Sequence, residues 1–79
     1  MNKVVIYSKP DCHLCEEMKS IVLKIRKECS FKFNEININD DKLLFEKFKE
    51  KIPVLEINGR IFAKFSIDEE KLKSRLLSI

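Results

Sequence analysis

Apolar residues in the first third of the chain form a short continuous run and then a helical stripe. The run "KVVIY" at residues 3–7 is β-branched and aromatic, which is typical of a strand buried on both faces. After it, apolar residues recur at three- and four-residue spacing, which predicts a helix over about residues 13–29. The stripe consists of Leu14, Met18, Ile21, Val22, Ile25 and Cys29. We therefore expect a central strand followed by a first helix.

The next segment has the pattern of a second strand and a short second helix. "FKFNEINI" at residues 31–38 alternates, but its phase slips between Phe33 and Ile36, so we expect the strand to end or bulge near Glu35. "NDD" at residues 39–41 offers N-cap side chains for a short helix that stops before Pro53. The order up to this point is β-α-β-α.

A hairpin and a last helix follow. Short strands at 54–57 and 61–65 are joined by Asn58-Gly59, a pair that tolerates the positive φ angles of a two-residue turn. Ser66 and Glu69 then have the spacing of a capping box at the start of a third helix. That helix would present Leu72, Leu76 and Ile79 on one face. The last two strands are thus expected to be antiparallel neighbours.

The complete order, βαβαββα, predicts an α/β fold with a four-stranded mixed sheet flanked by three helices. It resembles the minimal thioredoxin-like (glutaredoxin-like) topology. With 79 residues and 44% hydrophobic content, the chain is expected to be a single domain spanning residues 1–79. In such a fold the loop after the first strand lies at the carboxyl edge of the sheet, where ligands of open α/β sheets bind.

The charge distribution and the length of the apolar segments narrow the range of functions expected for the chain. The net charge of +3 comes from 16 basic and 13 acidic residues that are mixed along the chain, which argues against nucleic-acid binding. The apolar part of "MNKVVIY" is too short for a signal peptide or a membrane span. We therefore expect a cytoplasmic protein that does not engage a membrane.

Two cysteines, Cys12 and Cys15, stand two residues apart where the first strand meets the first helix. A static disulfide framework is not expected from three cysteines in a reducing compartment. Zinc needs four ligands, but His13 lies between the pair and Cys29 lies at the far end of the helix, so no metal site is expected. The remaining interpretation is a working dithiol.

Position alone assigns different roles to the two thiols. The thiolate is the reactive form, and a helix N-terminus lowers a cysteine pKa from about 8.5 because unpaired N–H groups favour an anion. Cys12 is thus expected to be the exposed nucleophile, and Cys15, one turn further on, the buried resolving thiol. Lys9 adds a nearby cation. Asp11 and His13 are expected to tune the site in opposite senses, the histidine only when it is protonated.

The segment "IYSKPDCHLCEEMK" resembles the glutaredoxins, and most closely the short glutaredoxin-like proteins with the pattern "YS-x-P-x-CHLC". A second block, "KIPVLEINGR", is similar to the family segment that carries a cis-proline opposite the dithiol. The resemblance implies a thiol-disulfide oxidoreductase with Cys12 and Cys15 as catalytic residues. It also implies that Lys9 lies near a substrate carboxylate, and that Pro53 is cis and leaves the Ile52 backbone to pair with substrate.

One departure from the glutaredoxin pattern bears on the substrate. The positions that hold the γ-glutamyl end of glutathione fall here on "AKFS", residues 63–66. We therefore expect a disulfide-containing protein or a small thiol as partner, with glutathione as a weak co-substrate, no resident cofactor and a monomeric state. The alternatives are a non-catalytic thioredoxin-fold binding module and a glutathione-linked iron-sulfur carrier.

Overall fold

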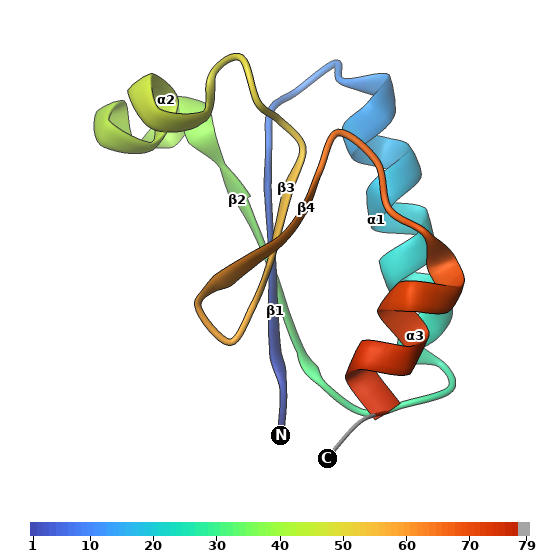
Figure 1. Cartoon of the computed structure of the whole chain (residues 1–79). Helices are drawn as coiled ribbons and strands as arrows, with labels where there is room; N and C mark the ends of the chain where they lie inside the picture. The colour runs from blue at the N-terminus through green and yellow to red at the C-terminus, as the bar shows by residue number, and fades with distance from the viewer. Residues whose placement is uncertain (78–79) are drawn as a thin grey trace.

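The expected order of helices and strands is present in the computed structural model, which describes residues 1–77 (Figure 1). The elements are β1 (Lys3–Ser8), α1 (His13–Arg26), β2 (Lys32–Asn37), a 3-10 turn η1 (Ile38–Asp40), α2 (Lys42–Phe48), β3 (Val54–Ile57), β4 (Arg60–Lys64) and α3 (Glu69–Leu77). The sheet order is β2-β1-β3-β4. β1 pairs in parallel with β2 and antiparallel with β3, and β3 pairs antiparallel with β4, so the mixed four-stranded sheet is confirmed.

Helices lie on both faces of the sheet, and each face has its own apolar cluster. Figure 1 shows α1 and α3 side by side on one face, with α2 at the opposite side near the carboxyl end of β1. The larger cluster lies between the sheet and the α1–α3 pair; its buried members are Val4, Ile6, Met18, Val22, Ile25, Phe31, Leu55, Ile57, Leu72 and Leu76. The smaller cluster lies near α2; its buried members are Cys15, Ile38, Phe48, Ile52 and Val54. Alternating residues of β1 and β3 supply both clusters because successive side chains point to opposite faces.

The β3–β4 hairpin turns at Asn58-Gly59, as the sequence predicts. Asn58 has φ +53° and Gly59 has φ +85°, which are the positive values that a two-residue turn of this kind requires. The strand register shifts between Leu55 and Glu56, so Phe62 is an extra residue on β4. β4 ends at Lys64, one residue earlier than expected, because Phe65 has φ +69° and leaves the extended conformation.

The prediction that β2 ends or bulges near Glu35 is wrong. β2 pairs with β1 without interruption from Lys32 to Asn37. Glu35 points to the α1 side of the sheet, where Lys19 and Ser8 bind its carboxylate. An exposed polar residue therefore occupies a position on the α1 face of the strand. This interrupts the alternation of apolar and polar residues in the sequence, although the backbone pairing is regular.

The first helix also ends earlier than residue 29. α1 stops at Arg26, and a tight turn follows in which the N–H groups of Glu28 and Cys29 both donate to the Ile25 carbonyl. The chain must reverse here so that β2 can begin beside β1. Cys29 still packs against the larger cluster, and its thiol lies 3.6 Å from the Ile25 carbonyl oxygen.

The capping box at Ser66 is not formed. Asp68 caps α3 instead, since its carboxylate accepts the N–H of Lys71 at 3.1 Å and its carbonyl accepts the N–H of Leu72. Leu72 and Leu76 are buried as expected. The third residue expected on that face, Ile79, lies outside the described residues. At the second helix the prediction is confirmed, because the Asp41 side chain accepts the N–H groups of Leu43 and Leu44.

The helices between residues 1 and 77 are all too short or too polar to cross a lipid bilayer.

Candidate functional site

Cys12 occupies the N-cap of α1, at the end of the loop that follows β1. Its backbone is extended, with φ −114° and ψ 107°, and its sulfur accepts the backbone N–H of Cys15 at 3.2 Å. Helix N-termini leave N–H groups without intrahelical partners, and such groups favour a negative charge. The expected placement of Cys12 at a helix start is therefore confirmed.

Cys15 lies one turn further along α1 and is joined to Cys12 by a disulfide, with the two Cα atoms 5.2 Å apart. This Cα separation lies within the usual range for disulfides. Cys15 is 2% exposed and packs in the smaller cluster, whereas Cys12 is only partly buried. The expected difference in exposure between the two cysteine residues is confirmed.

The segment before β3 lies against the dithiol. The Ile52–Pro53 peptide bond is cis, as the resemblance implies, and Pro53 is almost fully buried. Its neighbours Ile52 and Val54 belong to the same apolar cluster as Cys15. The Pro53 carbonyl accepts the N–H of Phe65 at 2.7 Å, which ties the β4–α3 loop to this segment.

Tyr7 covers the dithiol region from the α2 side of the sheet. Its ring packs on that of Phe48, with centroids 4.8 Å apart, and against the cluster that holds Cys15. The hydroxyl donates a hydrogen bond to Glu56 Oε1 at 2.9 Å. Burial, together with this bond and the negative charge of Glu56, raises the pKa of Tyr7 to about 12. The hydroxyl therefore serves as a neutral donor to Glu56, a partner that sequence reasoning had not identified.

A polar network fixes the start of the loop that carries Cys12. Ser8 is only 5% exposed, and its hydroxyl donates to Glu35 Oε2 at 3.2 Å. Lys19 of α1 donates to Glu35 Oε1 at 2.9 Å, and this hydrogen bond raises the pKa of Lys19 above its usual value. The network joins β1, β2 and α1 at the edge of the sheet where the dithiol lies.

The remaining charged candidates lie on the surface of the loop and the first helical turn. Lys9 is exposed and lines a cavity of about 240 Å³ together with the carboxylate residues Glu16 and Glu35. Asp11 is exposed and has φ +57°, a left-handed conformation that aspartate tolerates better than most residues. His13 points to the helix surface, with Nε2 2.9 Å from Glu17 Oε1. Its nearest ionic partner is thus a carboxylate.

Two exposed apolar residues, one in the first turn of α1 and one on the β4–α3 loop, were not identified as site residues from the sequence. Leu14 was expected in the buried stripe but is 45% exposed, because Cys15 takes the inward position of that helical turn. Phe65 is 47% exposed on the β4–α3 loop. Both line one cavity of about 140 Å³. Their hydrophobicity made them look like core residues, and only the helix phase and the loop conformation expose them.

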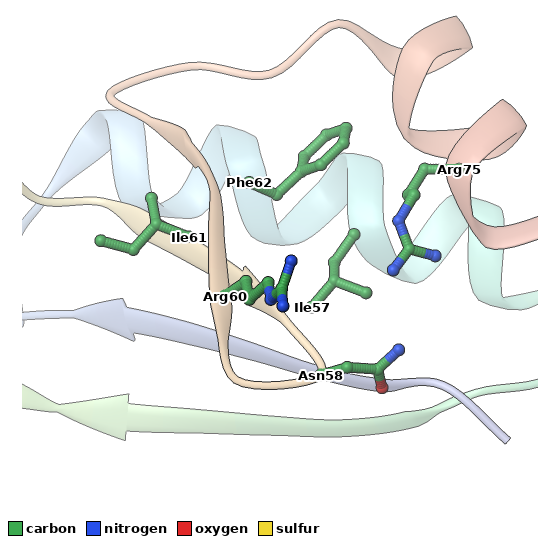
Figure 2. Close-up of a pocket in the computed structure, with 6 residues that line it drawn as sticks. All are labelled: Ile57, Asn58, Arg60, Ile61, Phe62 and Arg75. Atoms are coloured by element: carbon green, nitrogen blue, oxygen red, sulfur yellow. The ribbon is translucent and has the colours of Figure 1, made fainter.

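A separate cavity of about 350 Å³ lies at the β3–β4 turn, where side chains of Arg60 and Arg75 lie around Ile57 and Phe62 (Figure 2). No cysteine lines it. Across the described part of the chain, no group of three or more His, Cys, Asp or Glu side chains forms a metal-binding cluster. The reactive side chains described above therefore lie together at the Cys12–Cys15 end of the molecule.

Comparisons with known proteins agree with this geometry. The family model described as "Glutaredoxin-like domain (DUF836)" matches residues 3–77. A glutaredoxin-like protein of Dictyostelium discoideum is 36% identical over 72 residues, which are 84% of this chain and 67% of that protein. A protein of Nitrosomonas europaea superposes with a TM-score of 0.81 at 27% identity, over 95% of this chain and 91% of that chain.

A thioredoxin of Halobacterium salinarum has a TM-score of 0.71 at 15% identity, over 95% of this chain and 71% of that one, and it shows the fold alone. Together, the sheet topology and these similarities confirm the thioredoxin-like fold. A cysteine pair at disulfide distance in such a fold supports a redox role in general.

Proposed function

The chain belongs to the glutaredoxin-like domain family, and from this premise we propose that it is a thiol-disulfide oxidoreductase that reduces or exchanges disulfides through Cys12 and Cys15. The observation that carries the proposal is the hydrogen bond from the Cys15 N–H to the Cys12 sulfur at the start of α1. The same N–H, and the positive end of the helix dipole, would stabilise the Cys12 thiolate once the disulfide is opened.

The reaction proceeds through one mixed disulfide. The Cys12 thiolate attacks one sulfur of the substrate disulfide, forms a Cys12–substrate bond and releases the other substrate sulfur as a thiolate, which takes up a proton. The Cys15 thiol loses its proton and attacks the Cys12 sulfur, which forms the Cys12–Cys15 disulfide and releases the second substrate thiol. Two electrons pass from the protein to the substrate. An external dithiol, or two monothiols such as glutathione, then reduces the protein disulfide.

Other residues supply binding and orientation in this proposal. The backbone of Ile52, beside Pro53, pairs with an extended substrate, and Lys9 attracts a substrate carboxylate. Asp11 and His13 adjust the charge around Cys12. The substrate is a protein disulfide or a small mixed disulfide, and the protein acts as a monomer without a resident cofactor.

Serine variants of the two cysteines test the assignment of roles. We expect Cys12→Ser to abolish disulfide exchange, because it removes the nucleophile at the helix N-terminus. Cys15→Ser is expected to accumulate a mixed disulfide on Cys12, because no resolving thiol remains. Intact-protein mass spectrometry after incubation of the reduced variants with a disulfide-bonded peptide identifies the adduct.

The third cysteine provides a matched control. Cys29 lies in the turn after α1 and packs against the larger cluster. We therefore expect Cys29→Ser to retain the exchange activity and, like the wild-type protein, to accumulate no mixed disulfide. An adduct on Cys15 in the Cys12→Ser protein, with none on Cys12 in the Cys15→Ser protein, would reverse the proposed order. Absence of turnover in the wild-type protein with several disulfides would favour the non-catalytic binding module.

A further inference from the structure

We propose that the cavity at the β3–β4 turn binds a small phosphate monoester that carries an aromatic ring. This cavity, called here the arginine cavity, has a volume of about 350 Å³, which is within the range of small-molecule sites. Its lining consists of Ile57, Asn58, Arg60, Ile61, Phe62 and Arg75. Neither cysteine of the dithiol belongs to this lining, so the inference is independent of the proposed oxidoreductase function.

Hydrogen bonds through Asn2 join the two walls of the arginine cavity. At the hairpin turn, Asn58 Nδ2 donates to Asn2 Oδ1 at 2.9 Å, and Asn2 Nδ2 donates to the Leu76 carbonyl of α3 at 3.3 Å. Arg60 begins β4 just after the turn, and Arg75 directly precedes Leu76. The backbone segments that carry the two arginines are therefore linked before a ligand binds, which lowers the entropy cost of binding.

The arginine cavity has a positive charge that faces a ligand. Arg60 and Arg75 are the ionisable residues in its lining, and Figure 2 shows their guanidinium groups beside Ile57. Within residues 1–77, the ion pairs that form involve neither arginine. Both guanidinium groups therefore retain N–H donors for a ligand, and the planar arrangement of these donors matches the oxygens of a phosphate or a carboxylate.

A neighbouring cavity of about 490 Å³ favours a phosphate monoester over other anions. It shares Phe62 and Arg75 with the arginine cavity and adds Glu70, Lys71 and Ser74 to the lining. Together the two cavities carry three cationic side chains and one carboxylate, a formal charge of +2. A phosphate monoester has a charge of about −1.5 to −2 at pH 7, so it balances this charge better than a single carboxylate does. Glu70 would repel a second negative group, so the rest of the ligand is expected to be uncharged.

Apolar surface beside the arginines accounts for the aromatic ring of the ligand. Phe62 is the extra residue of the bulge in β4, and such bulges redirect side chains. Its side chain packs against the larger cluster but stays partly exposed, and the adjacent Ile61 is 47% exposed. Because Phe62 and Arg75 line both cavities, a ring that stacks on Phe62 lies next to a phosphate bound by Arg75.

Titration of the full-length chain with three simple probes tests the proposal. Phenyl phosphate, inorganic phosphate and phenylacetate would each be added to isotope-labelled protein at neutral pH and constant ionic strength. Chemical-shift changes of the backbone amides give the affinity and the location of binding. We expect phenyl phosphate to bind about tenfold or more tightly than either other probe, because it alone combines the phosphate with a ring. The changes should centre on residues 57–62 and 70–75.

Substitutions in the cavity separate the contribution of charge from that of stacking. Arg60→Gln and Arg75→Gln are each expected to weaken phenyl phosphate binding about tenfold or more, because each removes hydrogen bonds between charged groups. Phe62→Leu keeps an apolar side chain against the larger cluster. It should weaken phenyl phosphate binding about threefold or more and leave the affinity for inorganic phosphate unchanged. Arg26→Gln is the matched control, because Arg26 is exposed on α1 and lines neither cavity.

Several results would overturn the proposal. Equal affinities for phenyl phosphate and inorganic phosphate would remove the ring from the ligand, and tighter binding of phenylacetate would assign the cavity to carboxylates. An equal loss of affinity in Arg26→Gln would show that the probes respond to the overall positive charge of the chain. Chemical-shift changes that avoid residues 57–62 and 70–75 would place the anion elsewhere. Each of these results leaves the oxidoreductase proposal standing, because none of the measurements uses disulfide exchange.

Discussion

The pKa of Tyr7 reports on the surroundings of the dithiol, because Tyr7 packs against the cluster that contains Cys15. Its ring packs on that of Phe48, and its hydroxyl donates a hydrogen bond to Glu56 Oε1. Burial disfavours the phenolate, and the Glu56 carboxylate accepts the hydroxyl proton and repels a second negative charge. The neutral phenol is therefore the form that the folded protein stabilises.

A spectrophotometric titration measures this effect directly, because Tyr7 is the only tyrosine and the chain has no tryptophan. We expect an apparent pKa of about 12 in the wild-type protein. Glu56→Gln removes the negative charge and should move the pKa back toward the ordinary value of about 10. Glu46→Gln, a surface change on α2, should leave it unchanged. An unshifted pKa in the wild-type protein would contradict the hydrogen bond in the fold described here.

The same shift has a consequence for stability at high pH. The folded-state pKa lies above the unfolded value of 10.0, so the contribution of Tyr7 is fully present below about pH 10 and is lost as pH rises toward 12. Tyr7→Phe has no ionisable group at this position. Its free energy of unfolding in urea, followed by circular dichroism, should therefore fall less steeply between these two pH values than that of the wild-type protein. Parallel curves for the two proteins would contradict the shift.

At the scale of the secondary-structure elements, aspartate N-caps define where the two short helices, α2 and α3, begin. α2 and α3 are too short to be stable as isolated helices, so they depend on packing and on satisfied terminal N–H groups. Asp41 accepts two N–H groups at the start of α2, and Asp68 accepts one at the start of α3. These caps set where the connection after β2 ends and α2 begins, and where the loop after β4 ends and α3 begins.

The competing caps of α3 are distinguishable by mutation. Asp68→Ala is expected to lower the free energy of unfolding by about 1 kcal/mol, the usual cost of losing an N-cap. Ser66→Ala is the matched control and should change it by a few tenths of a kcal/mol at most, because no hydrogen bond from the Ser66 side chain to α3 is present in the described chain. Urea denaturation of both variants measures the difference. A larger loss for Ser66→Ala would support the capping box instead.

At the scale of the whole molecule, the interior consists of two apolar clusters, and only one of them contains a cysteine of the dithiol. Ile25 belongs to the larger cluster under α1 and α3, and Ile38 belongs to the smaller cluster that contains Cys15; both are fully buried. Close packing makes each cluster sensitive to the loss of one methylene group. Only the smaller cluster contains Cys15, so we expect its packing to limit the access of solvent and reagents to that thiol.

Paired substitutions test this division. Ile25→Val and Ile38→Val should each cost about 0.5–1.5 kcal/mol of unfolding free energy. In a Cys12→Ser background, we expect Ile38→Val to accelerate alkylation of Cys15 more than Ile25→Val does, because it loosens packing directly around that thiol. Mass spectrometry of Cys15 over time gives the rates. Equal acceleration would mean that Cys15 becomes exposed only by global unfolding.

Local patterns in the sequence determined most of the fold and the identity of the dithiol. The β-branched run of β1, the helical stripe from Met18 to Ile25 and the Asn58-Gly59 turn each depend on residues close together in the chain, so they can be inferred without coordinates. The N-cap position of Cys12 and the burial of Cys15 follow from the same local geometry. Pro53 was recognised through resemblance to a family.

Tertiary structure alone decided which side chains surround the dithiol. Glu35 looked like an interruption of β2 because its partners, Ser8 and Lys19, come from distant parts of the sequence. Leu14 and Phe65 have the hydrophobicity of core residues, and only the rotation of α1 and the left-handed backbone at residue 65 leave them exposed. Periodicity reports how hydrophobic each face of an element is, whereas long-range contacts determine which of its residues another element covers.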